Sequence, residues 1–189
     1  MTEPTDQTIS AATDLTGLFG PILDPNDNAV KKGRVLISMD ASGSLSMRDD
    51  PNPPAGWTEK FATYWNEESF LAIRAKSIIE LVLTGATTWQ FDVDKGLLKF
   101  KNATHDTWYN ITYSAGQRPV KNLLLHATPS GKTPDTDDAR HSFNLMIKIG
   151  QTGPNGPGRP LPVMIDPDAK NPPPINSMSA PQSAPVPLL

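Results

Sequence analysis

The sequence predicts a mainly β protein, an antiparallel β-sandwich of the immunoglobulin-like or jelly-roll-like kind. Two observations favour this class. Short segments rich in β-branched and aromatic residues follow one another along the chain, and Gly-containing turns separate them at short intervals. The length of 189 residues suits one domain with a real core. The 20 prolines and 13 glycines also indicate that loops and extended tails take much of the chain.

The strands are expected at regular intervals. The first covers residues 34–39, an apolar run between Gly33 and a Gly/Ser turn. In residues 87–93, Trp89, Phe91 and Val93 alternate with polar residues, which is the period-two pattern of a half-buried strand. The other expected strands share a high content of apolar residues between turn signals: 77–83, 96–101, 106–114, 120–127, 141–150 and 163–165.

One segment departs from this pattern. Between residues 59 and 70, Phe61, Tyr64 and Trp65 fall roughly on one helical face, and Thr58 is suited to cap the start. We therefore expect a short helical segment near 59–70, between the first and second strands.

Three regions are expected along the chain: an N-terminal arm (1–32), a β-sandwich domain (33–170) and a Pro-rich C-terminal tail (171–189). The arm carries an apolar island that either belongs to a disordered terminus or docks on the domain or on a neighbouring subunit. The island consists of Leu15, Leu18, Phe19, Ile22 and Leu23. The tail is expected to be extended or polyproline-like.

Composition argues against several classes of partner. The formal net charge is −3 with both signs interspersed, so the chain offers no basic stripe for nucleic acid or for an anionic membrane. No apolar run is long enough to span a membrane. The N-terminus has neither the basic nor the apolar region of a signal peptide, so we expect synthesis in the cytoplasm. The absence of cysteine excludes disulfides and thiol catalysis.

Asp40, Ser42 and Ser44 follow the first strand in an Asp-x-Ser-x-Ser pattern. This pattern resembles the start of the metal-ion-dependent adhesion site of von Willebrand factor type A domains, in which hard oxygen ligands hold Mg²⁺ or Ca²⁺. Such a domain would continue with alternating helices and strands, whereas a Pro-rich loop follows here. We expect no metal site, and keep cation-dependent adhesion as an alternative, with Thr133, Asp135 and Asp138 as the imaginable later ligands.

Patterns of catalytic residues are weak. His105, His126 and His141 have no partner at metal-ligand spacing, and no nucleophile elbow is present. The segment Gly131-Lys132-Thr133 lacks the first glycine of a phosphate-binding loop and precedes Pro134. The sequence therefore predicts no catalytic residues, no cofactor and no enzymatic activity.

Aromatic side chains are the candidate binding residues. Trp89 is expected in the core, whereas Trp57, Trp65 and whichever of Trp108 and Tyr109 faces outward are expected to contact a ligand or partner. Stacking on a sugar ring would make the domain a carbohydrate-binding module.

The second half, residues 77–174, resembles the DP-EP family of small bacterial proteins. The matching features are the strand 78–83, the segment 143–149, and Asp166-Pro167 followed by Asn171-Pro172. A more distant resemblance is to inclusion-body proteins of the PixA and AidA type. These resemblances imply an all-β fold and, for the latter, self-association.

The function that these observations favour is non-catalytic. Free sheet edges and a preordered Pro-rich arm suit a structural, self-assembling protein, a homo-oligomer or a partner of another structural protein. The alternatives are the carbohydrate-binding module, whose partner would be a glycan, and the cation-dependent adhesion domain.

Overall fold

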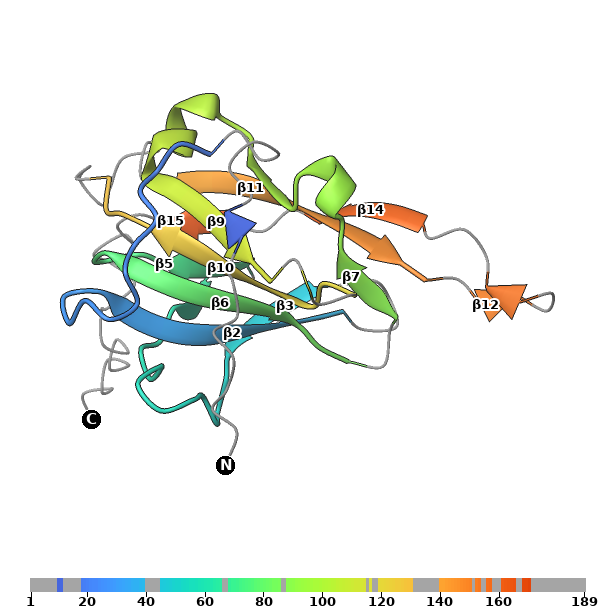
Figure 1. The fold of residues 1–189 in the computed structure, drawn as a ribbon, viewed down its shortest axis with the longest axis horizontal. Helices are drawn as coiled ribbons and strands as arrows, with labels where there is room; N and C mark the ends of the chain where they lie inside the picture. Colours follow the sequence, from blue (N-terminus) through green and yellow to red (C-terminus); the bar gives the residue numbers. More distant parts are fainter. Residues whose placement is uncertain are drawn as a thin grey trace, which may run out of the picture.

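The computed structural model shows a mainly β domain of two packed sheets, which confirms the predicted sandwich (Figure 1). The structure describes residues 10–11, 18–39, 45–65, 68–85, 88–114, 116, 119–130, 140–150, 152–153, 156–157, 161–165 and 168–170. Everything below concerns these residues.

The first sheet has six strands in the order β1-β9-β10-β6-β2-β3. In chain order, its members are β1 (Ser10–Ala11), β2 (Lys31–Met39), β3 (Leu45–Asp49), β6 (Ser77–Leu83), β9 (Tyr109–Tyr113) and β10 (Asn122–Ala127).

The second sheet is built around the longest strand, β11, and has the order β14-β11-β15-β5-β4, with β7 and β8 also paired to β11. In chain order, its members are β4 (Ala62–Trp65), β5 (Glu68–Ala72), β7 (Trp89–Phe91), β8 (Leu98–Phe100), β11 (Arg140–Ile149), β14 (Leu161–Ile165) and β15 (Asp168–Lys170). A small hairpin of β12 (Thr152–Gly153) and β13 (Gly156–Pro157) projects beyond β11.

Most strand pairs are antiparallel, as expected, but each sheet contains one parallel pair. Strand β2 runs parallel to β6, with Lys31 opposite Ser77, and β15 runs parallel to β5, with Ala169 opposite Leu71. Strands far apart along the chain therefore lie side by side, which places residues from distant segments at the same end of the sandwich.

Local pattern explains the strands. In β2, Val35 and Ile37 are buried while their neighbours are partly exposed, because successive side chains of a strand point to opposite faces. Central strand β6 is covered on both faces and is apolar almost throughout. The expected strands at 34–39, 77–83, 120–127 and 141–150 are confirmed by β2, β6, β10 and β11.

The helical segment expected near 59–70 is wrong. Strands β4 and β5 occupy most of this region and pair with Ala62 opposite Leu71. The run Phe70-Leu71-Ala72-Ile73 is buried along its whole length, which suits a strand between two neighbours better than an amphipathic helix with one exposed face. Two short 3-10 helices lie elsewhere, η1 (Val93–Lys95) and η2 (Ala103–Trp108).

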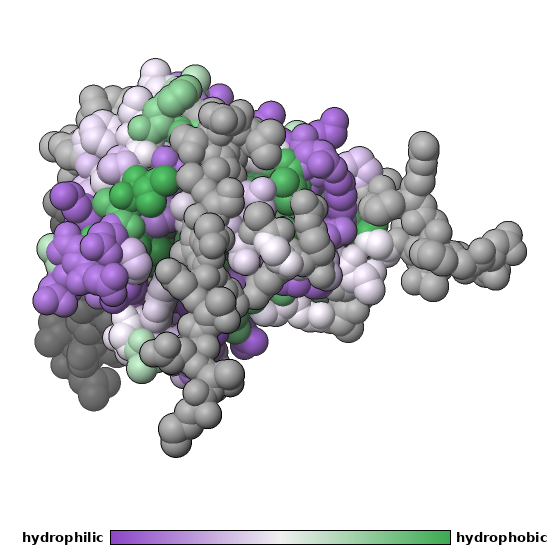
Figure 2. All heavy atoms as spheres, viewed as in Figure 1, coloured by the Kyte–Doolittle hydropathy of each residue, from purple (hydrophilic) through white to green (hydrophobic). Residues whose placement is uncertain are grey.

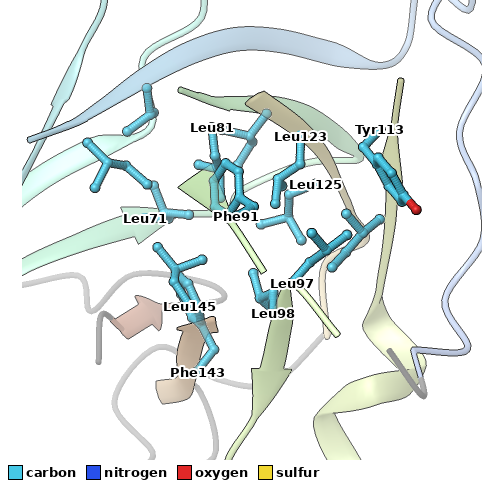
Figure 3. Close-up of a cluster of buried hydrophobic side chains, with 14 of the residues drawn as sticks. Leu71, Leu81, Phe91, Leu97, Leu98, Tyr113, Leu123, Leu125, Phe143 and Leu145 are labelled. Carbon is cyan, nitrogen blue, oxygen red and sulfur yellow. The ribbon is translucent and has the colours of Figure 1, made fainter. Parts of the chain in front are cut away.

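The hydrophobic core lies between the two sheets. Figure 3 shows Leu81, Leu123 and Leu125 of the first sheet beside Leu71 and Phe91 of the second. Trp89 is 1% exposed, which confirms its expected place in the core. Burial of these side chains is the main source of the domain's stability.

Residues 18–30 dock on the first sheet: Leu18 packs into the main core, and Leu23 and Val30 pack with Ile78 in a separate outer cluster. Leu18 and Leu23 are buried, while Phe19 and Ile22 are 74% and 50% exposed. The described part of the apolar island therefore docks on the domain through Leu18 and Leu23, while Phe19 and Ile22 face outward. Leu15 lies outside the described residues, and the division at residues 32 and 170 stays a prediction.

No helix in the described ranges has both the length and the apolar character needed to cross a bilayer.

Candidate active site

Two histidines and a tyrosine from separate segments meet at one end of the sandwich. His105 lies in η2, Tyr109 begins β9, and His141 is the second residue of β11. The rings of His105 and His141 are stacked, with centroids 3.9 Å apart and planes at 22°. The Tyr109 hydroxyl and Nδ1 of His141 share a hydrogen bond of 2.7 Å, whose direction depends on the imidazole tautomer. We call these three residues the His–Tyr cluster.

An aromatic wall supports the cluster from inside. Phe100 at the end of β8 stacks on Tyr109 with centroids 4.1 Å apart and meets the edge of His141 at 6.5 Å. Tyr109 and His141 are buried, whereas His105 is partly exposed. His105 is therefore the member of the cluster that a solute can reach, and the two buried residues hold it from behind.

Local sequence explains why η2 forms in front of β9. The Asn102 side chain accepts a hydrogen bond of 3.0 Å from the backbone N–H of Thr104, which caps the start of the helix. The docked N-terminal segment then fixes its end, because Phe19 N–H donates to the carbonyl of Asp106 at 3.0 Å. These contacts hold the backbone of η2, the element that carries His105.

A carboxyl group follows His105 directly in the chain. Partial burial raises the pKa of Asp106 above its ordinary value, because desolvation disfavours the charged form. The partly exposed imidazole of His105 is thus followed in the chain by a carboxyl group whose pKa is raised.

Strand register places the cluster relative to the rest of the sandwich. Tyr109 is opposite Ala127, Ala127 is opposite Ser77, and Ser77 is opposite Lys31. This row ends the four central strands of the first sheet. In the second sheet, His141 is opposite Ala169, which is opposite Leu71. At this same end of the sandwich, the β5–β6 connection takes the chain from the second sheet to the first. We call this end the Lys31 end.

His126 is separate from the cluster and holds the N-terminal segment in place. Its Nδ1 accepts a hydrogen bond of 3.1 Å from the backbone N–H of Leu23, and its Nε2 lies 2.9 Å from the Thr112 hydroxyl. Burial lowers the pKa of His126 to about 4. A neutral ring with both nitrogens engaged has a structural role.

Two ion-pair networks are also structural. Arg34 Nε donates to Glu80 at 2.6 Å, and the Asn122 amide donates to the other oxygen of Glu80 at 2.9 Å, which satisfies a nearly buried carboxylate. In the second sheet, Lys148 Nζ lies 2.9 Å from buried Asp92. Hydrogen bonds to Asp94 and Asp92 raise the pKa of Lys148.

The predicted binding residues are dispersed. Trp57 packs on the outer apolar cluster of Leu23, Val30 and Ile78, and Trp108 packs on the main core. Tyr109 is buried and belongs to the His–Tyr cluster. The backbone of Trp65 ends β4, but its side chain is outside the described set. A shared aromatic platform stays a prediction without further support.

The alternative cation site falls on residues that the structure does not describe. Asp40, Ser42 and Ser44, together with Thr133, Asp135 and Asp138, lie outside the described ranges. Within those ranges, no group of three His, Asp or Glu side chains could hold a metal ion.

Sequence reasoning missed the pairing of the histidines. Tyr109 and His141 are 32 residues apart, and their contact depends on two strands in different sheets. The local signal was limited to the Asn102-Ala103-Thr104 cap and to the position of His141 at the start of an apolar strand. Neither reveals that the two rings meet.

Comparison with known proteins changes the functional interpretation. A family model described as "predicted novel nucleotide synthetase" matches residues 28–174. No curated protein and no solved structure matches the chain.

This match overturns the expected family resemblances and the expected function, including the expectation of no enzymatic activity. The resemblances to the DP-EP family and to the PixA and AidA type are wrong, because the matching family is a different one. The expectation of a non-catalytic, self-assembling structural protein or binding module is also wrong, because the description of the family names a synthetase, which is an enzyme. The match covers well over half of the chain, and the chain therefore belongs to the pNTSase1 family of predicted novel nucleotide synthetases.

Proposed function

We propose that this protein is an enzyme that forms a new bond to a nucleotide, and that the His–Tyr cluster supplies its acid–base chemistry. The observation that carries the assignment of residues is the stack of partly exposed His105 on buried His141, which Tyr109 holds by a hydrogen bond. Family membership supplies the class of substrate.

The chemistry of such a reaction calls for a base. When a hydroxyl or amine attacks a phosphoryl group, the new bond to phosphorus forms while the bond to the leaving group breaks, and the nucleophile loses a proton. A positioned imidazole is the side chain most often used to accept such a proton near neutral pH. His105 is the candidate catalytic residue because it is the partly exposed member of the cluster. Its Nδ1 is buried, so Nε2 is the nitrogen proposed to accept the proton.

His141 and Tyr109 are proposed as positioning residues. Their hydrogen bond fixes the ring of His141, and the stack then fixes the plane of His105. Two positively charged imidazoles at this spacing would repel each other, so the arrangement favours at least one neutral ring. A neutral ring is the form that accepts a proton.

Product formation from nucleotides tests the proposal. Full-length protein is incubated with single nucleoside triphosphates and with pairs of them in the presence of Mg²⁺. Anion-exchange chromatography and mass spectrometry follow the products. His105→Gln is expected to lower kcat by about 10²-fold or more, the size of a lost acid–base contribution. Tyr109→Phe is expected to cause a smaller loss and to shift the pH profile of kcat.

The matched control is Tyr113→Phe, which removes a tyrosine hydroxyl from the same strand as Tyr109 but outside the cluster. It is expected to leave kcat per folded molecule unchanged, with folding checked by circular dichroism. If wild-type protein forms no product from any nucleotide, the proposed activity is wrong. If it does and His105→Gln retains full kcat, the assignment to the cluster is wrong.

A further inference from the structure

A second polar feature lies at the Lys31 end beside β2, whereas the His–Tyr cluster lies at the same end beside β9. A cavity of about 220 Å³ lies between the turn that precedes β2 and the segment around Thr58. Hydrophilic side chains gather over that turn (Figure 2). The cavity is lined chiefly by polar side chains: Asp27, Asn28, Lys31, Lys32, Thr58 and Glu59.

The walls of this cavity are held in place by the fold. Lys32 N–H and C=O belong to β2, and Glu59 N–H donates to the carbonyl of Lys32 at 2.9 Å. Thr58 forms an isolated bridge with Gly33. The Lys32 ammonium donates to the carbonyl of Pro25 at 2.8 Å, which ties the preceding turn to the same strand. Three segments thus line a preformed, open hollow.

Two further basic residues lie in the β5–β6 connection beside Lys31. The backbone N–H of Lys31 donates to the carbonyl of Lys76 at 2.8 Å, so the β5–β6 connection lies directly beside Lys31. Arg74 and Lys76 are exposed in this connection. The segment from Phe70 to Ile79 contains no acidic residue. Lys31 lines the cavity, and Arg74 and Lys76 lie in the connection beside it. We call these three basic residues the cationic rim of the cavity.

The distance to the cluster suits one extended ligand. Lys31 and Tyr109 end the same register row and are separated by three strand spacings, which corresponds to about 14 Å between their backbones. The volume of the cavity is smaller than that of a pocket for a complete drug-sized ligand. It suits part of a nucleotide better than the whole.

We infer that this cavity and its cationic rim bind the sugar-phosphate part of the nucleotide, a deepening that rests on the proposed function. Lys31 and Lys76 neutralise the phosphate, and Arg74 adds to the local field. The carboxylates of Asp27 and Glu59 accept hydrogen bonds from sugar hydroxyls, which pure phosphate lacks. The mixture of two acids with the lysines distinguishes this site from one for inorganic phosphate alone.

Calorimetric titration with ribose 5-phosphate, ATP and tripolyphosphate tests the site. The double variant Lys31→Ala, Lys76→Ala is expected to weaken binding of all three by tenfold or more, with a reduced dependence on salt. Glu59→Gln is expected to weaken ribose 5-phosphate and ATP but not tripolyphosphate. Lys95→Ala, which removes an exposed lysine of η1, is the matched control and is expected to change none of the affinities.

The outcomes separate this inference from the proposed function. Turnover of a nucleotide with unchanged KM in the double lysine variant would overturn the site while the enzymatic activity stands. Lysine-dependent binding of ribose 5-phosphate without any nucleotide turnover would support the site and overturn the activity. No binding of any of the three probes to the wild-type protein would overturn the site.

Discussion

The backbone N–H of Leu23 donates a hydrogen bond of 3.1 Å to Nδ1 of His126, a residue 103 positions later in the chain. This bond ties the N-terminal segment to the outer face of the first sheet, beside the apolar contacts of Leu23 and Val30 with Ile78. It requires a neutral imidazole, since a protonated Nδ1 can only donate.

Acid is therefore expected to weaken the fold through His126. Its pKa is about 4 in the folded protein and about 6.5 in the unfolded chain. Between these values the unfolded chain binds the proton and the folded protein does not, so stability falls as the pH drops from about 6.5 to about 4 and then levels off. The loss from this residue is about 3 kcal/mol.

Urea denaturation at pH 7 and at pH 4.5 measures this effect, with His126→Gln as the comparison. The variant is expected to lose less stability than the wild type over the same interval, because its side chain does not titrate. Equal losses in the two proteins would contradict the role of His126.

Removal of the Tyr109 hydroxyl is expected to weaken the fold as well as catalysis. Tyr109→Phe leaves buried His141 without its 2.7 Å hydrogen bond to the hydroxyl, at a cost of about 1–3 kcal/mol in the free energy of unfolding. Tyr113→Phe in the same strand is the control, because Tyr113 belongs to the apolar core. Similar stabilities of the two variants in urea would argue against an important Tyr109–His141 contact.

Gly33 is required where the segment around Glu59 crosses β2. A Cβ atom at this position would lie 2.1 Å from the carbonyl oxygen of Glu59 and 2.9 Å from the ring of Phe61. Gly33→Ala is expected to destabilise the protein by about 1–3 kcal/mol and to weaken ribose 5-phosphate binding, because it displaces a wall of the cavity.

Thermal unfolding and calorimetry check the prediction for Gly33. Gly116→Ala is the matched control, since a Cβ atom there would have no neighbour within 4 Å among the described residues. A Gly33→Ala protein with the Tm of the wild type would show that the crossing is looser than its geometry indicates.

Lys148 is expected to stabilise the second sheet through Asp92. Asp92 is 1% exposed and Lys148 Nζ lies 2.9 Å from its carboxylate. Lys148→Met is expected to lower the free energy of unfolding by about 2 kcal/mol, because a nearly buried carboxylate loses its cation. Lys99→Met, at an exposed position of β8, is expected to change it by less than about 0.5 kcal/mol. Urea denaturation of both variants decides between these expectations.

Local pattern was sufficient for the strands with strong periodicity. The alternation around Val35 and Ile37, and the apolar run of β6, are properties of neighbouring residues and predict strands without knowledge of their partners. The region 59–70 failed because Phe61 and Tyr64 fit a helical face, while the preference for β4 and β5 comes from their pairing with each other and with β15.

Local sequence patterns could not predict the candidate site. His105 and His141 have no diagnostic spacing, and the sequence led to their dismissal as isolated histidines. The self-assembly hypothesis followed from the Pro-rich ends and the sheet edges and was wrong, because the matching family is one of predicted nucleotide synthetases. Family membership came from comparison and not from any single motif.

The class of fold, the burial of Trp89 in the main core and the absence of cysteine chemistry follow from the sequence. These depend on composition and on short-range periodicity, which the chain carries in neighbouring residues. Tertiary structure alone decided that β2 runs parallel to β6, that His105 stacks on His141, and that Lys31 and Tyr109 end the same row. Such contacts join residues far apart in the chain, and their energy depends on the order and direction of strands rather than on any local pattern.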